Sequence, residues 1–249
     1  MTDQAPVATI DHLRRSVCVA RRLMPSILAI HAGQQPALSR AATELRAGGI
    51  LATDELDPLV TTLVEVMTNP QLVISVEVYR SAKPNLATFW ATPRRAVVGL
   101  TDDQNRFELI QVEPTLLQFH LAQSTGLRPR PSPPFSGSFS LPSRTLRFAE
   151  ENIATNPIGV ETRLRTDRVS AEWTDRLMAA LAMRRSLWNV ASVWLGKTNF
   201  RNESSLSVLD AGFAGYWRLT TTPDGLVTVA TTDFDELLSR IDGLLPTTN

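Results

Sequence analysis

The chain has 249 residues, of which 43% are hydrophobic and 20% charged, and its 25 basic side chains equal its 25 acidic ones in number. This composition argues against intrinsic disorder, and the neutral balance argues against a chain drawn to nucleic acid or to an anionic membrane surface. One cysteine cannot form an internal disulfide, the first residues do not resemble a secretion signal, and no apolar run approaches the roughly 20 residues of a membrane span. We therefore expect a cytoplasmic protein without membrane insertion.

Three helices are predicted before the first long strand. The first covers residues 11–23, where apolar residues recur every three or four positions. The second covers 36–47 and ends at a glycine pair, since glycine readily adopts the left-handed conformation found at helix C-termini. The third begins after Asp54, a favourable N-cap, and tolerates Pro58 in its first turn because the early amides there have no partner within the helix.

Residues 72–112 are predicted to form three or four consecutive antiparallel strands. Ile74, Val76 and Val78 alternate with polar residues, which is typical of a strand with one buried face. Further strands are expected at 86–91, 96–100 and 107–112, and a helix follows from Pro114 to Gly126.

Composition changes after this helix. Residues 128–143 contain five prolines together with serine, glycine and arginine, which predicts an extended connector. We place there the boundary between two halves, residues 1–127 and 144–249, of one domain.

The second half is predicted to repeat the order of the first. A helix over 171–183, capped by Ser170, precedes a strand at 187–195 and a polar loop at 197–204. The remaining strands are expected at 206–209, 216–220 and 226–230, with a hairpin turn at 222–225 and a final helix capped by Thr232. The fold class is therefore α/β, more specifically α+β: a central antiparallel sheet built from two meander halves with pseudo-twofold symmetry, with helices at its sides.

The sequence indicates no catalytic centre and no metal site. His12, His31 and His120 lack metal-ligand spacing to one another and to Cys18, and we expect no cofactor. Phe89 and Trp90 point to opposite faces of one strand, so one of them is expected to fill the core, while the other is free to meet a partner.

The order of these parts resembles the EspG family of type VII secretion chaperones. The likeness rests on residues 45–50, the helix that follows to Asn69-Pro70, the meander from Ile74, the run Tyr216-Trp217-Arg218-Leu219, and the 223–225 hairpin with the last strand and helix. The opening strand is reduced to 7–10, and residues 143–169 match the family pattern poorly.

The resemblance implies a central sheet with two helical bundles and a role as a specific chaperone, with no enzymatic activity. The expected partner is a PE-PPE heterodimer, bound at the helical tip of its PPE subunit, kept soluble and targeted for export. The chaperone itself is expected to be a monomer or a weak dimer. The residues carried over as partner-binding lie on the loop at 81–85, beside it, and in the second bundle: Tyr79, Arg80, Ser81, Lys83, Asn85, Phe89, Arg176, Met183 and Arg184.

A second class of function stays open at this point. A small-ligand carrier or an enzyme could use a pocket between the sheet and the helices. The sequence neither shows nor excludes such a pocket.

Overall fold

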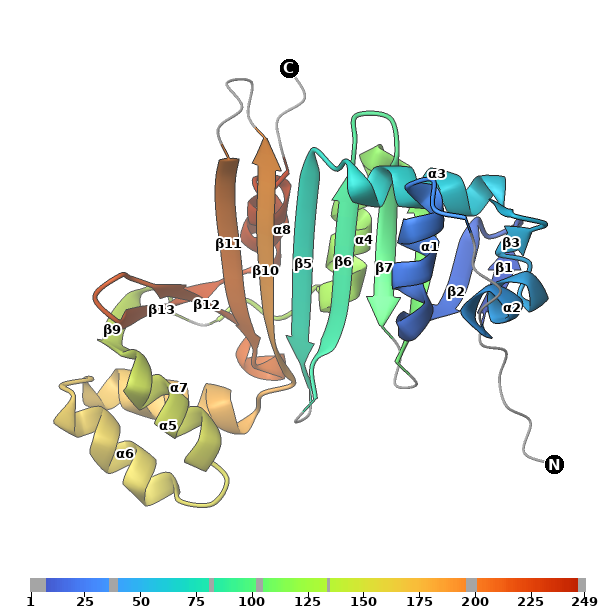
Figure 1. The fold of residues 1–249 in the computed structure, drawn as a ribbon. Helices are drawn as coiled ribbons and strands as arrows, with labels where there is room; N and C mark the ends of the chain where they lie inside the picture. Colours follow the sequence, from blue (N-terminus) through green and yellow to red (C-terminus); the bar gives the residue numbers. More distant parts are fainter. Residues whose placement is uncertain are drawn as a thin grey trace. The chain divides into compact units, whose positions relative to one another are not determined.

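The computed structural model describes residues 8–35, 40–80, 83–101, 105–133, 135–195 and 201–245. Eleven of the strands in these residues form one sheet with the order β1-β2-β8-β7-β6-β5-β10-β11-β12-β13-β9. The central eight strands are two consecutive meanders, β5 to β8 and β10 to β13, placed in mirror order on either side of the β5–β10 neighbours (Figure 1). The predicted fold class, an antiparallel sheet assembled from two meanders, is confirmed.

The chain folds into two compact units. We call the first the N-terminal unit; it comprises Met1–Ser75, Asn85–Phe119 and Ser192–Glu203. The second, the C-terminal unit, comprises Val76–Pro84, His120–Ala191 and Ser204–Asn249. Each unit therefore takes segments from both halves of the sequence.

The predicted helix over 11–23 is wrong. This stretch forms a hairpin of β1 (Ala8–Asp11) and β2 (Ser16–Ala20), and Pro25 lies in the first turn of α1 (Met24–His31). Val17 and Val19 are fully buried, so buried residues repeat here every two positions, as in a strand, and not every 3.6 positions, as in a helix. Because β2 pairs with β8, a partner some 90 residues further along the chain, the local pattern could not reveal it.

The other elements of the first half follow the prediction more closely. The glycine pair ends α2 (Arg40–Ala47), with Gly49 at φ 74°. The helix α3 (Pro58–Thr68) is capped by Asp57, whose carboxylate accepts the Leu59 N–H at 2.8 Å, and not by Asp54. The predicted cap falls instead between two short strands, β3 (Leu51–Ala52) and β4 (Glu55–Leu56), that separate α2 from α3.

The first meander is confirmed in all four strands. Their bounds are β5 (Leu72–Tyr79), β6 (Asn85–Ala91), β7 (Ala96–Thr101) and β8 (Arg106–Val112). The helix predicted after Pro114 is a 3-10 turn, η2 (Pro114–Leu116), continued by α4 (Leu117–Thr125). Gly126 ends it with φ 74°, as expected.

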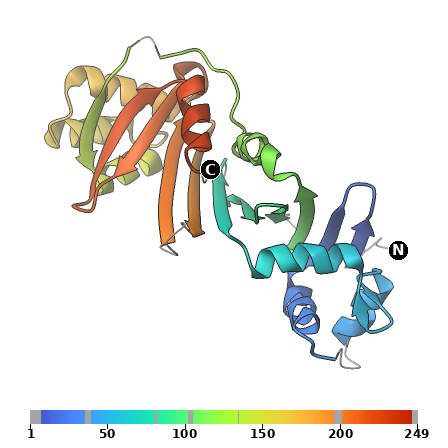
Figure 2. The same cartoon turned by 90° about the horizontal axis from the view of Figure 1, so that it is seen from above.

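The proline-rich segment is more structured than the sequence indicated. Its last part forms β9 (Ser138–Pro142), an edge strand paired with β13. Two helices that the sequence analysis did not predict follow it, α5 (Ser143–Asn152) and α6 (Pro157–Thr166). With α7 (Ala171–Ala182), capped by Ser170 as predicted, they form a three-helix group in the C-terminal unit (Figure 2).

The second meander is confirmed with two corrections. Its strands are β10 (Ser186–Leu195), β11 (Arg201–Asp210), β12 (Tyr216–Thr221) and β13 (Leu226–Thr232). Residues 201–204, predicted as loop, belong to β11, and residues 196–200 lie outside the described part. The last helix, α8 (Phe234–Asp242), is capped by Asp233 and not by Thr232.

Candidate partner-binding surface

The first group of predicted site residues lies at the end of β5. Tyr79 is half-buried and its hydroxyl donates to a Glu77 carboxylate oxygen at 2.9 Å; this hydrogen bond is the main cause that raises the Tyr79 pKa. Arg80 and Lys83 are exposed. The Arg80 guanidinium lies against the end of α4. Its Nη2 is so close to Gly126 that a Cβ added to this glycine would be only 2.8 Å away. Ser81 lies outside the described residues.

The second group lies on α7 and just after it. Arg176 stacks on Phe135, with its guanidinium carbon 3.6 Å from the ring centroid, and pairs with Glu172 one turn earlier. Its side chain is therefore largely committed within the protein. Met183 and Arg184, in contrast, are exposed, and 45% of the Met183 surface is accessible to solvent.

Parts of these two groups come together. The strands β5 and β10 are neighbours and run in opposite directions, so the end of β5 lies beside the start of β10 (Figure 1). Met183 and Arg184 lead directly into β10, and all of these segments belong to the C-terminal unit. The structure thus places Tyr79 and Arg80 at the same end of the sheet as Met183 and Arg184.

Asn85 and Phe89 belong to the N-terminal unit, and Phe89 requires a correction as a contact residue. Asn85 is exposed at the start of β6, but Phe89 is 0% exposed because Ala87, Phe89 and Ala91 share the buried face of this strand. Trp90 lies on the other face and packs beside the N-terminal core, where it covers Gly99: an added Cβ there would be 2.7 Å from the indole. Of the two aromatics, Phe89 is the one that fills the core.

An exposed aromatic that the sequence analysis missed lies in the C-terminal unit. Phe213 is 81% exposed in the 3-10 turn η3 (Gly212–Ala214) between β11 and β12. The Arg185 guanidinium carbon is 5.8 Å from the centre of its ring. The available signal was a phenylalanine enclosed by Gly212 and Gly215, which marks a turn and not a strand interior.

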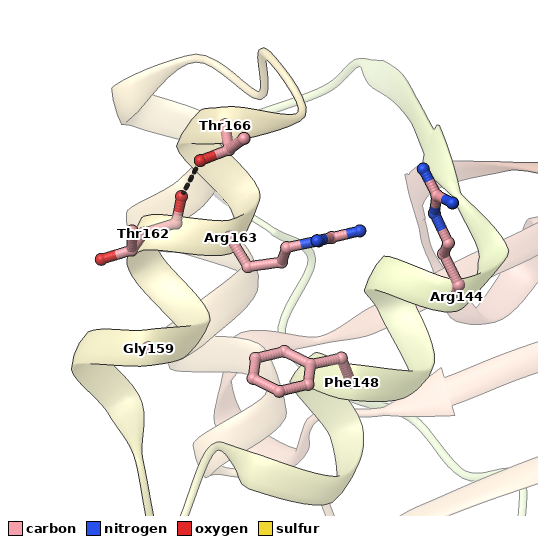
Figure 3. A pocket seen from close by; sticks show the side chains of 6 residues that line it. All are labelled: Arg144, Phe148, Gly159, Thr162, Arg163 and Thr166. Carbon is pink, nitrogen blue, oxygen red and sulfur yellow. Dashed lines mark hydrogen bonds between the residues drawn. The ribbon is translucent and has the colours of Figure 1, made fainter.

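One pocket of about 590 Å³ lies between α5 and α6 and bears on the ligand alternative. It is lined by Arg144, Phe148, Gly159, Thr162, Arg163 and Thr166 (Figure 3). Arg163 already contacts Asp167 at 3.2 Å and Thr145 at 3.4 Å, and the Thr166 hydroxyl donates to the Thr162 carbonyl at 2.8 Å. Most polar groups here are thus satisfied within the protein, and the pocket lies between helices rather than between the sheet and helices.

The described residues were compared with the requirements of a metal site and of a membrane-spanning helix, and they meet neither. They contain no group of three or more His, Cys, Asp or Glu side chains that could hold a metal ion. No helix in the same residues is long and apolar enough to cross a membrane.

Fold and surface together define the class: an α+β protein whose candidate residues present apolar and cationic side chains at one end of a sheet. The chain belongs to the EspG family, whose model matches residues 22–243. No curated protein sequence matches it.

Among solved structures, the chain is similar to one described as the Mycobacterium tuberculosis type VII secretion system chaperone EspG5 in complex with a PE25-PPE41 dimer. The TM-score is 0.62 at 13% identity, and the match covers 94% of this chain and 98% of the other. At this identity the likeness establishes the fold.

Proposed function

We propose that this protein is a cytoplasmic chaperone of type VII secretion that binds the helical tip of the PPE subunit of a PE-PPE heterodimer. It would keep that pair soluble and targeted for export, and it needs no catalytic residue to do so. The observation that carries the proposal is the match over nearly both full chains to EspG5, which was solved in complex with a PE-PPE dimer.

The binding surface we propose lies at the end of β5 and at the start of β10. There Arg80, Lys83, Met183 and Arg184 are exposed, and Tyr79 is half-buried beside them in the chain. A reversible complex requires a few apolar anchors within a polar rim. This group contains both kinds of side chain.

The test is co-expression of the chain with each PE-PPE pair encoded in its genome, followed by size-exclusion chromatography. We expect one stable ternary complex, and the elution volume of the free chain will also test whether it is a monomer or a weak dimer. The double variant Lys83→Asp, Arg184→Asp should lose co-elution. The two introduced carboxylates would repel the acidic partner groups that Lys83 and Arg184 are proposed to contact.

The matched control is Arg144→Asp, which reverses an exposed arginine in the α5–α6 pocket. It should co-elute as the wild type does. If no pair co-elutes with the wild type, the chaperone proposal is wrong. If the control loses binding and the double variant keeps it, the surface is misplaced.

A further inference from the structure

The turn between β11 and β12 holds one large apolar side chain in solvent while it buries its neighbours. Phe213 is 81% exposed, whereas Ala211, Tyr216 and Trp217 are at most 1% exposed. Isolated exposed apolar residues are common and need no explanation by themselves. What distinguishes Phe213 is how firmly its turn is held.

Three hydrogen bonds fix the backbone of this turn, and an ion pair holds the side chain that accepts one of them. The Ala211 N–H donates to the Gly215 carbonyl at 3.0 Å, and the Ala214 N–H to the Ala211 carbonyl at 3.1 Å. The Gly212 N–H donates to an Asp210 carboxylate oxygen at 2.8 Å. The other oxygen of Asp210 pairs with Arg130 at 2.6 Å, and these two side chains are only 6% and 11% exposed.

Arg185 is tied to the same turn. Its backbone N–H donates to the Asp210 carbonyl at 2.8 Å, and its side chain runs across Gly212, where an added Cβ would lie 2.9 Å from Nε. Gly212 has φ 63°, so a glycine is needed there both for the conformation and for this approach. The Arg185 guanidinium carbon lies 5.8 Å from the centre of the exposed Phe213 ring, and the carboxylate of this turn, Asp210, pairs with Arg130 rather than with Arg185.

A pre-positioned aromatic beside a cation suits a partner with particular chemistry. Aromatic and arginine side chains dominate binding hot spots, and fixing them in advance lowers the entropy lost on binding. The nearest carboxylate in the turn, Asp210, is buried and neutralised by Arg130, so the exposed charge beside Phe213 is positive. This surface therefore favours an apolar contact flanked by an acidic group.

We propose that Phe213 and Arg185 form an anchor for the PE-PPE partner. Phe213 packs against apolar side chains at the helical tip, and Arg185 pairs with a carboxylate next to them. The anchor continues the proposed surface, since Arg185 directly follows Met183 and Arg184 in the chain. It rests on the proposed chaperone function.

The test is titration of the purified PE-PPE pair that co-elutes with the wild type against four variants, by calorimetry at two salt concentrations. Phe213→Ala is expected to raise the Kd about 30-fold, as truncation of a hot-spot aromatic does, and Phe213→Leu should recover part of the affinity. Arg185→Ala should raise the Kd and weaken its dependence on salt. The control is Ile158→Ala, which removes a 77% exposed apolar side chain from α6 and should change the Kd less than twofold.

The outcomes separate the two proposals. If the wild type binds no pair, the chaperone function and the anchor are both wrong. If the wild type binds and Phe213→Ala binds within twofold of it, the function stands and the anchor is overturned. Thermal unfolding of each variant shows whether a lost affinity reflects a lost fold, and it should match that of the wild type because these residues are exposed. Arg185→Ala then tests the anchor independently of Phe213.

Discussion

The cores of the two units are built from different side chains. The main buried cluster of the N-terminal unit is mostly aliphatic and takes residues from β1, β2, β3, β7, β8 and α1 to α3, with Leu45, Leu63 and Val64 fully buried. The C-terminal core adds a group of rings: Trp173 lies 5.0 to 6.2 Å from the centroids of Phe135, Phe139 and Trp217. It also has the Arg130–Asp210 pair near its edge.

This difference bears on how each unit holds its surface turns in place. An aliphatic core specifies a fold by volume and shape. A buried ion pair with further hydrogen bonds fixes particular backbone atoms, here those of the turn that carries Phe213. In the C-terminal unit, a buried ion pair thus holds the turn that exposes Phe213.

The largest expected effect separates a core phenylalanine from a surface one. Phe89→Ala should lower the free energy of unfolding by about 4 kcal/mol, because it leaves a cavity where a fully buried ring was. Phe213→Ala should change it by less than about 0.5 kcal/mol, since that ring is exposed. Urea denaturation of both variants checks this; similar losses would contradict the assignment of the two rings.

The next effect tests the ion pair that holds the turn. Arg130→Met should lower the free energy of unfolding by about 3 kcal/mol, because Asp210 would remain buried without a counter-charge. The double variant Arg130→Met, Asp210→Asn should cost less than the single one, since the amide oxygen can still accept the Gly212 N–H without a charge. Equal losses in the two variants, measured by urea denaturation, would show that the pair contributes nothing through its charge.

A smaller effect distinguishes the observed cap of α3 from the predicted one. Asp57→Ala should cost about 1 kcal/mol, because the Leu59 N–H loses its acceptor. Asp54→Ala removes only an exposed ion pair with Arg46 and should cost less than about 0.5 kcal/mol. Thermal unfolding of the two variants gives the order; a larger loss for Asp54→Ala would restore the prediction made from sequence.

The smallest effect concerns pH. Burial raises the pKa of Glu150 on α5, while Arg184 opposes the shift. The folded state then holds this proton more tightly than the unfolded state, so the contribution of Glu150 to stability is lost as pH rises from the unfolded pKa through the folded one. Glu150→Gln should thus be slightly more stable than the wild type at pH 7 and lose that advantage near pH 4. Urea denaturation at both values tests this, and a variant that is less stable at pH 7 would contradict it.

Local sequence patterns sufficed for the meanders. In β5, every second residue is apolar, and the turn at 222–225 contains the proline and glycine of a tight hairpin, with Gly225 at φ 81°. Such signals depend on residues that are close together in the sequence, so they can be recognised without knowledge of the rest of the fold. The predicted cap Ser170 was right, whereas Asp54 and Thr232 were displaced by Asp57 and Asp233, because more than one residue that can cap lies within a few positions of those helix starts.

Tertiary structure decided the rest. The stretch at 11–23 has apolar spacings that suit a helix, but β2 gains a ladder of hydrogen bonds from β8, far away in sequence. The exposure of a single apolar side chain depends in the same way on what packs around it. The sequence by itself determined the two central meanders and five of the eight α-helices in the described residues, because periodicity and turn chemistry are local. The added strands β2 and β9, and which ring is buried and which is exposed, Phe89 or Phe213, were decided only when distant segments packed together.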